Sequence, residues 1–442
     1  MTRARFAILL IAIVLMPGSA ARGSRYGAPL PDPAGVIDLP AGFTYRIVSR
    51  TGDEMSDGLR VPALPDGMGA FRGPDGTTIV VCNHEAALGS DVEWLARVDS
   101  TKLYDRGLQG TPPAGGTTTF VWDTRSQRLI RRYLSLAGTL LNCSGGTTPW
   151  NTWLTCEETT LPAGSAEGKV RLGRNHGYVF EVPARADGGL VSATPLAALG
   201  RFTHEAVAYD ERTGVLYQTE DVEDGLFYRF LPAVERSWSA GKLQALALRD
   251  GQRDTDNHTA GASHIRVRES LEVKWIDMHE VDAATDSLRY QGYSRGACRF
   301  DRPEGMCMIN GAVYFACTSG GPIAAGQIWR YKPSRREGRA REQRVPGTLE
   351  LYYEVPDRAL VLNPDNICPT PDGDLLLCED PINFSYARLV VLTRDRDVYT
   401  LARSRLRGEF TGAVFSPDGS TMFVNMQLAG ITLAVTGPWK KK

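Results

Sequence analysis

Short apolar segments that end in turn-forming residues recur along most of the chain, and pairs of them have the pattern of β-hairpins. The clearest pair runs from Asn142 to Glu158, where two short strands flank a reversal at Trp150–Asn151. Because the two strands of a hairpin are antiparallel, the start and the end of this segment should lie side by side. The thiol of Cys143 would therefore lie close to the carboxylates that end the segment.

Six copies of this pattern follow one another, each with a further apolar strand after it. In four copies the same number of residues separates two anchor positions, which are Cys143 and Cys156, Glu304 and Cys317, Asp365 and Cys378, and Thr411 and Val424. Turn formers lie midway at 74–76, 310–311, 371–373 and 417–419. The further strands are expected at 117–123, 176–182, 225–231, 326–331, 387–392 and 430–435. Helical periodicity is almost absent, so the sequence predicts an all-β fold, a six-bladed β-propeller.

The last copy contains only three strands, and a single apolar strand at 42–49 precedes the first copy. Pairing of 42–49 with the last copy would close the ring and cover a strand edge that would otherwise be open. Two longer segments, about 86–116 and 232–299, are expected to be insertions that form walls or a lid rather than a second domain. We therefore expect one propeller domain over 22–442.

The composition is that of an ordinary globular protein, because 42% of the 442 residues are hydrophobic and 23% are charged. The 50 Lys and Arg residues nearly balance the 51 Asp and Glu residues. The chain as a whole therefore has no field that would draw it to nucleic acid or to anionic lipid, and any electrostatic function must be local. We expect no nucleic-acid partner, no stable membrane insertion and a monomer.

Residues 1–21 have the pattern of a secretory signal peptide. Arg3 and Arg5 give a basic start, an apolar run extends from Phe6 to Met16, and small residues follow up to Ala21. The apolar run is too short to span a bilayer, and no cysteine follows it as a lipid attachment point. These features predict a soluble protein that is periplasmic or secreted.

In a propeller, the first residue of each innermost strand and the last residues of the next strand lie at the same end of the central channel. That end would carry a ring of Asp66, Cys143, Glu205, Glu304, Asp365 and Thr411, with Glu85, Cys156, Glu157, Glu220, Asp221, Glu379 and Asp380 beside it. Like charges in a partly buried channel repel one another strongly, so protons or multivalent cations must neutralise them. Carboxylate oxygens suit calcium, and a thiolate among them suggests a transition metal such as iron.

Simpler interpretations of these residues remain open. Acids at the mouth of a propeller can be merely solvated, and each cysteine taken singly fits a small thiol that fills a tight inner strand. His84 and His204 each precede an acid of this group, and a core or rim position explains both. Ser144 lacks the glycine elbow of a hydrolase nucleophile, which argues against a serine mechanism.

A set of short motifs carries a more specific signal. The motifs are Asn142-Cys143-Ser144-Gly145-Gly146, Trp153-Leu154-Thr155-Cys156-Glu157-Glu158, Phe202-Thr203-His204-Glu205, Thr219-Glu220-Asp221, Arg302-Pro303-Glu304-Gly305, Pro364-Asp365-Asn366, Cys378-Glu379-Asp380 and Asn425-Met426-Gln427. In this order they resemble the PhoX-type alkaline phosphatases. The resemblance covers most of the chain from about Asp66 onward.

The resemblance implies a six-bladed propeller whose mouth holds an iron and calcium cluster and hydrolyses phosphate monoesters outside the cytoplasm. It implies that Cys156 is the thiolate that bridges iron, that acids such as Glu205 bind metal, and that Arg302 contacts the substrate phosphate. Together with the ring, it predicts Arg302 and Glu304 as catalytic residues. The predicted metal ligands are Glu85, Cys156, Glu157, Glu205, Glu220, Glu304, Asp365 and Glu379.

Two other functions remain open on the sequence. One is a calcium-dependent propeller hydrolase that acts on a lactone or another ester, which needs carboxylates but no thiolate. The other is a binding propeller whose metal ions only rigidify the channel. Chelator-sensitive hydrolysis of an aryl phosphate, without hydrolysis of an aryl ester, would separate the phosphatase from both.

Overall fold

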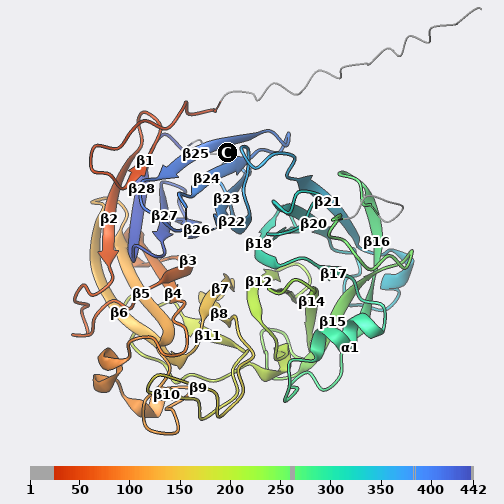
Figure 1. Ribbon diagram of the computed structural model, residues 1–442, viewed down its shortest axis with the longest axis horizontal. Helices are drawn as coiled ribbons and strands as arrows, with labels where there is room; N and C mark the ends of the chain where they lie inside the picture. The colour runs from red at the N-terminus through yellow and green to blue at the C-terminus, as the bar shows by residue number, and fades with distance from the viewer. Residues whose placement is uncertain (1–23, 259–263, 382, 384, 440–442) are drawn as a thin grey trace, which may run out of the picture.

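The computed structural model describes residues 24–258, 264–381, 383 and 385–439. In this part of the chain, antiparallel β-strands form sheets that are arranged around a central axis (Figure 1). The prediction of an all-β, propeller-like fold is confirmed. The predicted signal peptide at 1–21 lies outside the described residues. No helix of the described part combines the length and the apolar character that crossing a membrane requires.

Six antiparallel sets of strands follow one another along the chain. The first set contains β3 (Pro65–Arg72), β4 (Thr77–His84), β5 (Gly115–Asp123) and β6 (Arg128–Thr139), and the second contains β7 (Asn142–Thr147), β8 (Thr152–Glu157) and β11 (Val179–Pro183). The third set contains β12 (His204–Asp210), β13 (Val215–Glu220), β14 (Gly225–Pro232) and β15 (Gly241–Leu248). In each set, neighbouring strands of this order pair with one another. The second set includes the hairpin predicted from Asn142 to Glu158.

The other three sets repeat this arrangement. The fourth set contains β18 (Pro303–Ile309), β19 (Ala312–Cys317), β20 (Gln327–Lys332) and β21 (Thr348–Glu354). The fifth contains β22 (Pro364–Pro369), β23 (Leu375–Glu379), β24 (Arg388–Leu392) and β25 (Val398–Ser404), and β1 (Ile37–Asp38) pairs with β25 at its outer edge. The sixth contains β26 (Phe410–Phe415), β27 (Thr421–Met426), β28 (Ile431–Thr436) and β2 (Thr44–Arg50). The first strands of the six sets, β3, β7, β12, β18, β22 and β26, contact one another in this order, and β26 contacts β3. These contacts close a ring around the channel.

Hydrogen bonding does not separate the six sets into one sheet each. The strand β16 (Ser270–Asp277) pairs with both β15 and β21, so the third and fourth sets belong to one ten-stranded sheet. The six-bladed prediction missed this connection because the segment 232–299 was expected to be loops. That segment contains β15, β16 and the helix α1 (Leu288–Ser294), and β17 (Arg299–Phe300) pairs with β14.

The remaining elements are short. They are the 3-10 helices η1 (Pro74–Gly76), η2 (Glu93–Arg97), η3 (Ser100–Lys102), η4 (Ala197–Leu199) and η5 (Glu342–Arg344), and the ribbon of β9 (Ala166–Glu167) and β10 (Val170–Arg171). The helices η2 and η3 lie in the predicted insertion at 86–116. All residues of β8 and β13 are buried, because neighbouring sets cover both of their faces.

The predicted closure of the ring is confirmed. The strand β2 pairs antiparallel with β28, from Thr44 opposite Thr436 to Arg50 opposite Ile431. Just before β2, the ring of Phe43 packs edge-on against Trp439, with 4.6 Å between the ring centroids. The N-terminal strand therefore supplies the outer edge of the last set.

Deleting residues 24–49 is expected to destabilise the fold by about 5 kcal/mol or more. The deletion removes β2 and the buried side chain of Phe43, and truncation of one buried phenylalanine alone costs roughly 3–5 kcal/mol. It also opens the edge of β28 to solvent. Chemical denaturation of the deleted chain and of a chain that begins at Ser24 would measure the difference. Equal unfolding free energies would contradict this account of closure.

Candidate active site

A β-bulge begins each innermost strand, and it places one side chain at the mouth of the channel. The bulged residues are Asp66–Gly67, Cys143–Ser144, Glu205–Ala206, Glu304–Gly305, Asp365–Asn366 and Gly412–Ala413. A bulge inserts an unpaired residue and turns its side chain away from the regular alternation. In the first five sets the side chain turned toward the channel is an acid or a thiol.

Glycines next to these residues let the inner strands approach closely. A Cβ atom on Gly67 would lie 2.7 Å from the carbonyl oxygen of Cys143, and one on Gly305 would lie 2.6 Å from the Cα atom of Asn366. Both distances are shorter than carbon contacts allow, so only glycine fits there. The close approach holds neighbouring ring residues near one another.

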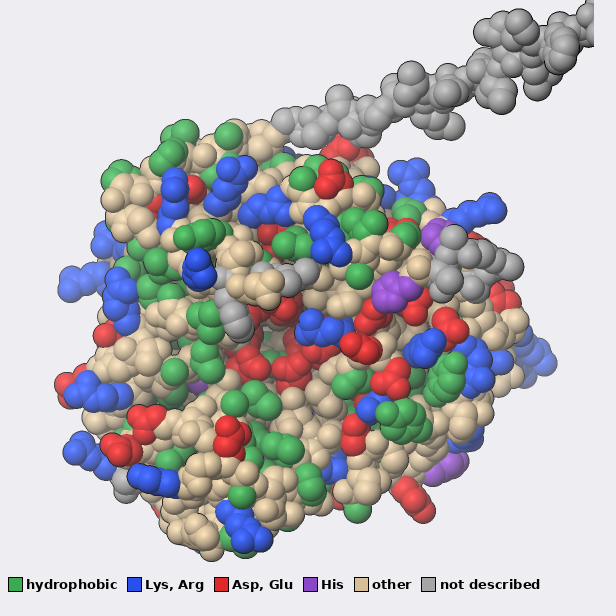
Figure 2. Space-filling model, viewed as in Figure 1, with side chains coloured by type: hydrophobic (Ala, Val, Ile, Leu, Met, Phe, Trp, Pro, Cys, Tyr) green, Lys and Arg blue, Asp and Glu red, His purple; other side chains and the backbone are tan. Residues whose placement is uncertain are grey.

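These side chains surround a cavity of about 210 Å³, the central cavity. Its lining residues are Asp66, Glu85, Cys143, Glu158, Glu205, Arg302, Glu304, Asp365, Asn366, Asp380, Glu409 and Gln427. Eight carboxyl groups therefore face one guanidinium group. Acidic side chains fill the hollow at the centre of this face of the molecule (Figure 2).

The guanidinium group of Arg302 is held by the acids around it. Its Nη2 atom lies 2.9 Å from Asp221 Oδ2 and 2.5 Å from Glu304 Oε1, and its Nη1 atom lies 3.8 Å from Asp380 Oδ2. One third of the side chain remains exposed. The structure thus brings together Arg302 and Glu304, the two predicted catalytic residues, and leaves part of the arginine open to a ligand.

Two groups in the central cavity have the spacing of metal ligands. Ligand atoms of Cys143, Glu158 and Glu205 lie within 4.8 Å of one another, and so do those of Glu205, Glu304 and Asp365. Glu205 belongs to both groups, and the thiol of Cys143 donates a hydrogen bond to its Oε2 atom. A set of carboxylates with one thiol suits hard cations together with a transition metal.

The electrostatics of the cavity require neutralisation. Burial raises the pKa of Glu205 well above its usual range, and the charge of Asp365 raises it further. Burial also raises the pKa of Glu304, and there the charges of Asp221 and Asp365 add to the effect. Burial raises the pKa of the Cys143 thiol, and the charge of Glu205 raises it further. Since one guanidinium cannot balance eight carboxyl groups, the residues fit a site for multivalent cations.

In three sets, the second strand ends in two consecutive acids, and the side chains of the two acids point in different directions. The pairs are Glu157–Glu158, Glu220–Asp221 and Glu379–Asp380. Successive residues of a strand point to opposite faces. The second members therefore turn toward the mouth: Glu158 and Asp380 line the central cavity, and Asp221 binds Arg302.

The first members, which the sequence analysis had placed at the metal site, point instead into the surrounding protein. Glu157 lies 2.6 Å from His176, Glu220 accepts a hydrogen bond from the hydroxyl of Tyr228 at 2.8 Å, and Glu379 lies 2.6 Å from Arg388. The structure does not bring these three carboxylates to the central cavity. Each holds a neighbouring segment while the next residue along the chain faces the mouth.

Cys156 also lies away from the central cavity. Its side chain is fully buried in an apolar cluster between the second and third sets, near Leu154 and Phe202. It lies opposite the bulge of β7, so the strand alternation directs it into the core while Cys143 turns to the mouth. The structure therefore brings Cys143, rather than Cys156, to the acids. Glu85, Glu205, Glu304 and Asp365 lie where they were predicted.

The sixth set contributes differently from the prediction. Thr411, expected in the ring, donates its hydroxyl to the carbonyl oxygen of Pro65 and does not line the central cavity. Glu409 lines the cavity instead, and sequence reasoning missed it. Its position directly before an innermost strand, like that of Arg302, is the signal that could have found it.

Gln427 is the second contribution of the sixth set. Its Nε2 atom donates hydrogen bonds to Asp66 Oδ2 at 2.8 Å and to Glu85 Oε2 at 2.6 Å. Two N–H groups on one amide nitrogen can serve two carboxylates at once. The amide therefore holds Asp66 and Glu85 close together without a charge.

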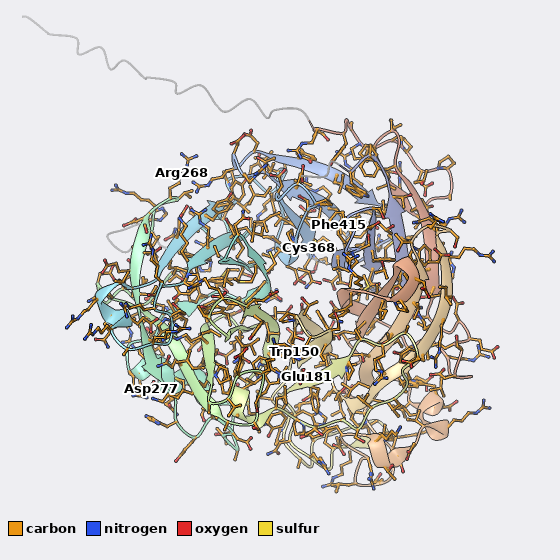
Figure 3. All side chains as sticks on the ribbon, turned by 180° about the vertical axis from the view of Figure 1, so that it is seen from behind. Trp150, Glu181, Arg268, Asp277, Cys368 and Phe415 are labelled. Atoms are coloured by element: carbon orange, nitrogen blue, oxygen red, sulfur yellow. The ribbon has the colours of Figure 1, made fainter. Side chains whose placement is uncertain are left out.

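The other end of the channel has different chemistry. A cavity of about 310 Å³ there is lined by inner-strand residues such as Met308 and Cys368, and Glu211 is the single carboxylate among its lining residues. Seen from behind, Cys368 lies toward the axis, whereas Arg268 and Asp277 lie at the outer edge (Figure 3). The acids of the channel are thus concentrated at one mouth.

Cys143→Ser is expected to lower the metal content of the protein, and Cys156→Ser is expected to leave it unchanged. The thiol of Cys143 belongs to a group of candidate ligand atoms, whereas Cys156 belongs to an apolar cluster and to neither of these groups. Both substitutions remove one buried thiol, so each serves as the matched control for the other. Elemental analysis of the two purified variants would measure the effect. Equal metal loss in both, or loss only in Cys156→Ser, would contradict the placement.

A buried histidine ties the predicted insertion at 86–116 to the second set. The Nδ1 atom of His176 lies 2.6 Å from Glu157, and its Nε2 atom lies 3.3 Å from Asp105. Burial lowers the pKa of His176, but the two carboxylates, Glu157 first, outweigh it and raise the pKa to about 9. The charged imidazolium is therefore part of the folded state at neutral pH.

This pKa predicts that stability falls as the pH rises. A histidine in the unfolded chain has a pKa of about 6.5. The stabilisation by His176 is therefore complete below about pH 6.5 and is lost between about pH 6.5 and 9, by at most roughly 3 kcal/mol. Urea unfolding of the metal-free protein across this range should show the decline, and His176→Gln should reduce it. An identical pH profile for the variant would contradict the prediction.

Comparison with solved structures finds chains that are similar over most of their length at low sequence identity. One is a gluconolactonase, XC5397 from Xanthomonas campestris (12% identity, TM-score 0.43, 90% of this chain and 97% of that chain). Another is a luciferin-regenerating enzyme (10% identity, TM-score 0.43, 90% of this chain and 96% of that chain). A third is a protein of unknown function from Bacteroides thetaiotaomicron (11% identity, TM-score 0.43, 89% of this chain and 76% of that chain). No curated protein matches the sequence.

The sequence matches the model of one protein family, described as alkaline phosphatase PhoX, over residues 24–430. This range covers nearly the whole chain and includes all residues of the central cavity. The family consists of metal-dependent phosphatases, which act on small-molecule phosphate esters. The chain therefore belongs to the PhoX alkaline phosphatase family.

Proposed function

We propose that the protein hydrolyses phosphate monoesters in the central cavity with iron and calcium as its metal ions. The observation that carries the proposal is the set of eight carboxyl groups and one thiol that surround a single arginine. The hard carboxylate oxygens favour calcium, and the thiol of Cys143 beside Glu158 and Glu205 favours iron. Metal ions bound there would offset the charge of the carboxylates and of the substrate phosphate.

The residues of the chain would hold these ions in two adjoining groups. Cys143 and Glu158 lie on one side of Glu205, and Glu304 and Asp365 lie on the other. Close packing of the inner strands fixes these positions, so the site needs little rearrangement when it is loaded.

Arg302 is the group best placed to bind the phosphate. Its side chain is anchored by Asp221 and Glu304, and one third of it is exposed at the cavity. A guanidinium offers a planar fork of N–H donors that matches two phosphate oxygens. Held in this way, the phosphorus forms a bond to a water oxygen, and its bond to the alcohol oxygen breaks. The alcohol leaves with a proton that the water gives up.

Two finer features belong to the same proposal. We count the ten-stranded sheet as two blades, because β12 and β18 each start a set at the axis, which makes six blades in all. We also propose that the protein works in the periplasm or outside the cell, as the signal-peptide pattern of 1–21 suggests. N-terminal sequencing of the protein from the periplasm or medium would test the export.

The activity is tested with an aryl phosphate and an aryl ester on the same preparation. We expect hydrolysis of the phosphate, loss of this activity after treatment with a chelator, and recovery with iron and calcium. Hydrolysis of the ester alone would favour the lactonase or esterase alternative, and no hydrolysis of either would favour a binding propeller. Elemental analysis of the untreated protein identifies the metals.

A further inference from the structure

A second acidic pocket lies beside the central cavity, and we call it the rim pocket. It has a volume of about 640 Å³ and is lined by Glu223, Asp224, Asp256, His258, Arg299, Asp301 and Ser319. Asp301 directly precedes Arg302 of the central cavity, and the backbone N–H of Arg302 donates to the carbonyl oxygen of Val222, one residue before Glu223. Acidic side chains extend from the central hollow toward histidine side chains on this face (Figure 2).

Two of the lining residues are already paired. Arg299 lies 2.5 Å from Asp254, which is outside the pocket, and Asp224 lies 2.9 Å from Arg289. In the described part of the chain, these contacts neutralise the one arginine and one of the four acids. The pocket therefore keeps an excess of negative charge.

Among the lining residues, His258 lies closest to the three other acids. The Nε2 atom of His258 lies 3.1 Å from Asp301 Oδ2 and 2.9 Å from the carbonyl oxygen of Ser319, and its Nδ1 atom lies 4.0 Å from Asp256 Oδ2. No ion pair of Glu223 occurs among the described residues. The charges of Arg302 and Arg299 also act on Asp301 and Asp256, but each of these arginines is already paired with another acid, Asp221 or Asp254.

Asp301 gives a separate indication that a donor is missing. The residue is 6% exposed, and within the described part of the chain its Oδ1 atom has no hydrogen-bond partner. A buried carboxylate oxygen without a donor is costly and uncommon. Burial raises the pKa of Asp301 to about 6, so at neutral pH this oxygen belongs mostly to an anion.

The pocket suits an organic cation better than a metal ion. Among the described residues, the groups of three ligand atoms close enough for one ion all lie in the central cavity. The volume of the rim pocket also exceeds what one ion needs. An ammonium group can donate to several separated oxygens, since it carries up to three N–H donors.

We propose that the rim pocket binds the ammonium end of the substrate, so that the enzyme prefers phosphate monoesters of amino alcohols. This inference rests on the proposed phosphatase function. The phosphate would be held at Arg302, and the leaving alcohol would extend past Asp301 toward Asp256 and Glu223. The reaction is hydrolysis as described above: phosphorus exchanges the alcohol oxygen for a water oxygen, and the amino alcohol leaves with the proton.

The test compares O-phosphoethanolamine with propyl phosphate, which has the same length but a methyl group in place of the ammonium group. We expect kcat/KM of the metal-loaded protein to be about fivefold higher for O-phosphoethanolamine, the effect of one partly exposed ion pair. Equal values, or a preference for propyl phosphate, would overturn the inference and leave the phosphatase function intact. Hydrolysis of neither ester, nor of an aryl phosphate, would overturn both.

Two variants test whether the rim pocket causes the preference for O-phosphoethanolamine. In Asp256→Asn and in Glu223→Gln, we expect the ratio of the two kcat/KM values to fall by about twofold. Both residues are at least partly exposed, so these changes should not disturb folding. Asp187→Asn is the matched control, because this acid is 82% exposed outside both cavities and should leave the ratio unchanged. An unchanged ratio in both rim variants would overturn the assignment of the pocket.

Discussion

Replacing Glu205 by glutamine is expected to lower bound metal and phosphatase activity together, the activity by about 100-fold or more. Glu205 belongs to both groups of candidate ligands and accepts the hydrogen bond of the Cys143 thiol. Glutamine keeps the size of the side chain but removes the charge and replaces one oxygen by an N–H donor. Elemental analysis and kcat/KM measured on the same preparation would show both losses.

The metal-free form should respond in the opposite direction. Burial and neighbouring acids raise the pKa of Glu205, so its ionised form destabilises the empty protein at neutral pH. Glu205→Gln removes one of these charges and should make the metal-free protein more stable while it reduces the stabilisation that metal gives to the wild type. Glu211→Gln is the matched control, because Glu211 lies at the opposite end of the channel. Full metal content and activity in Glu205→Gln would contradict the assigned role.

The sequence predicted the first residues of the innermost strands well. The shared spacing and the turn formers midway in their hairpins placed Glu304 and Asp365 at the mouth, and overlay of the six copies placed Glu205 there as well. Thr411, placed by the same spacing, does not line the central cavity. The N-terminal strand could be placed for a different reason, since only its pairing with the C-terminal strand completes the last set and closes the ring.

The ends of the second strands could not be assigned in the same way. Alternation makes the face of a side chain depend on register, and a shift of one residue exchanges Glu157 for Glu158 or Glu379 for Asp380. A bulge on the partner strand adds a shift that leaves no mark in the sequence. The resemblance implied Cys156 as the metal thiolate, whereas the bulge of β7 turns Cys143, a member of the predicted ring, to the acids.

The extra strand β16 shows a second limit of prediction from the sequence. Its residues alternate between exposed and buried, as expected of an outer strand, but the prediction treated the whole segment 232–299 as loops. The hydrogen bonds that join β16 to both β15 and β21 connect segments far apart in the sequence. No local pattern predicts such a connection, so the prediction missed that two of the sets share one sheet, while the all-β, propeller-like fold is confirmed.

Arg302→Ala is expected to lower phosphatase activity by about 100-fold or more without loss of metal. The guanidinium contributes donors to the phosphate but no ligand to a metal ion, and donors that tighten in the transition state commonly have effects of this size. The loss should appear mainly in kcat/KM, measured with an aryl phosphate at saturating iron and calcium. Elemental analysis of the same preparation should give the wild-type metal content.

A structural role for Arg302 leads to a different result. The side chain is paired with Asp221 and Glu304, so its removal also leaves two buried carboxylates without their cation. Arg302→Lys separates the two roles, because it keeps a positive charge for these acids but loses the planar fork. If the fork binds phosphate, the lysine variant should keep metal and stability and still lose activity. Full activity in Arg302→Lys, with instability only in Arg302→Ala, would show that the arginine serves the fold and not the substrate.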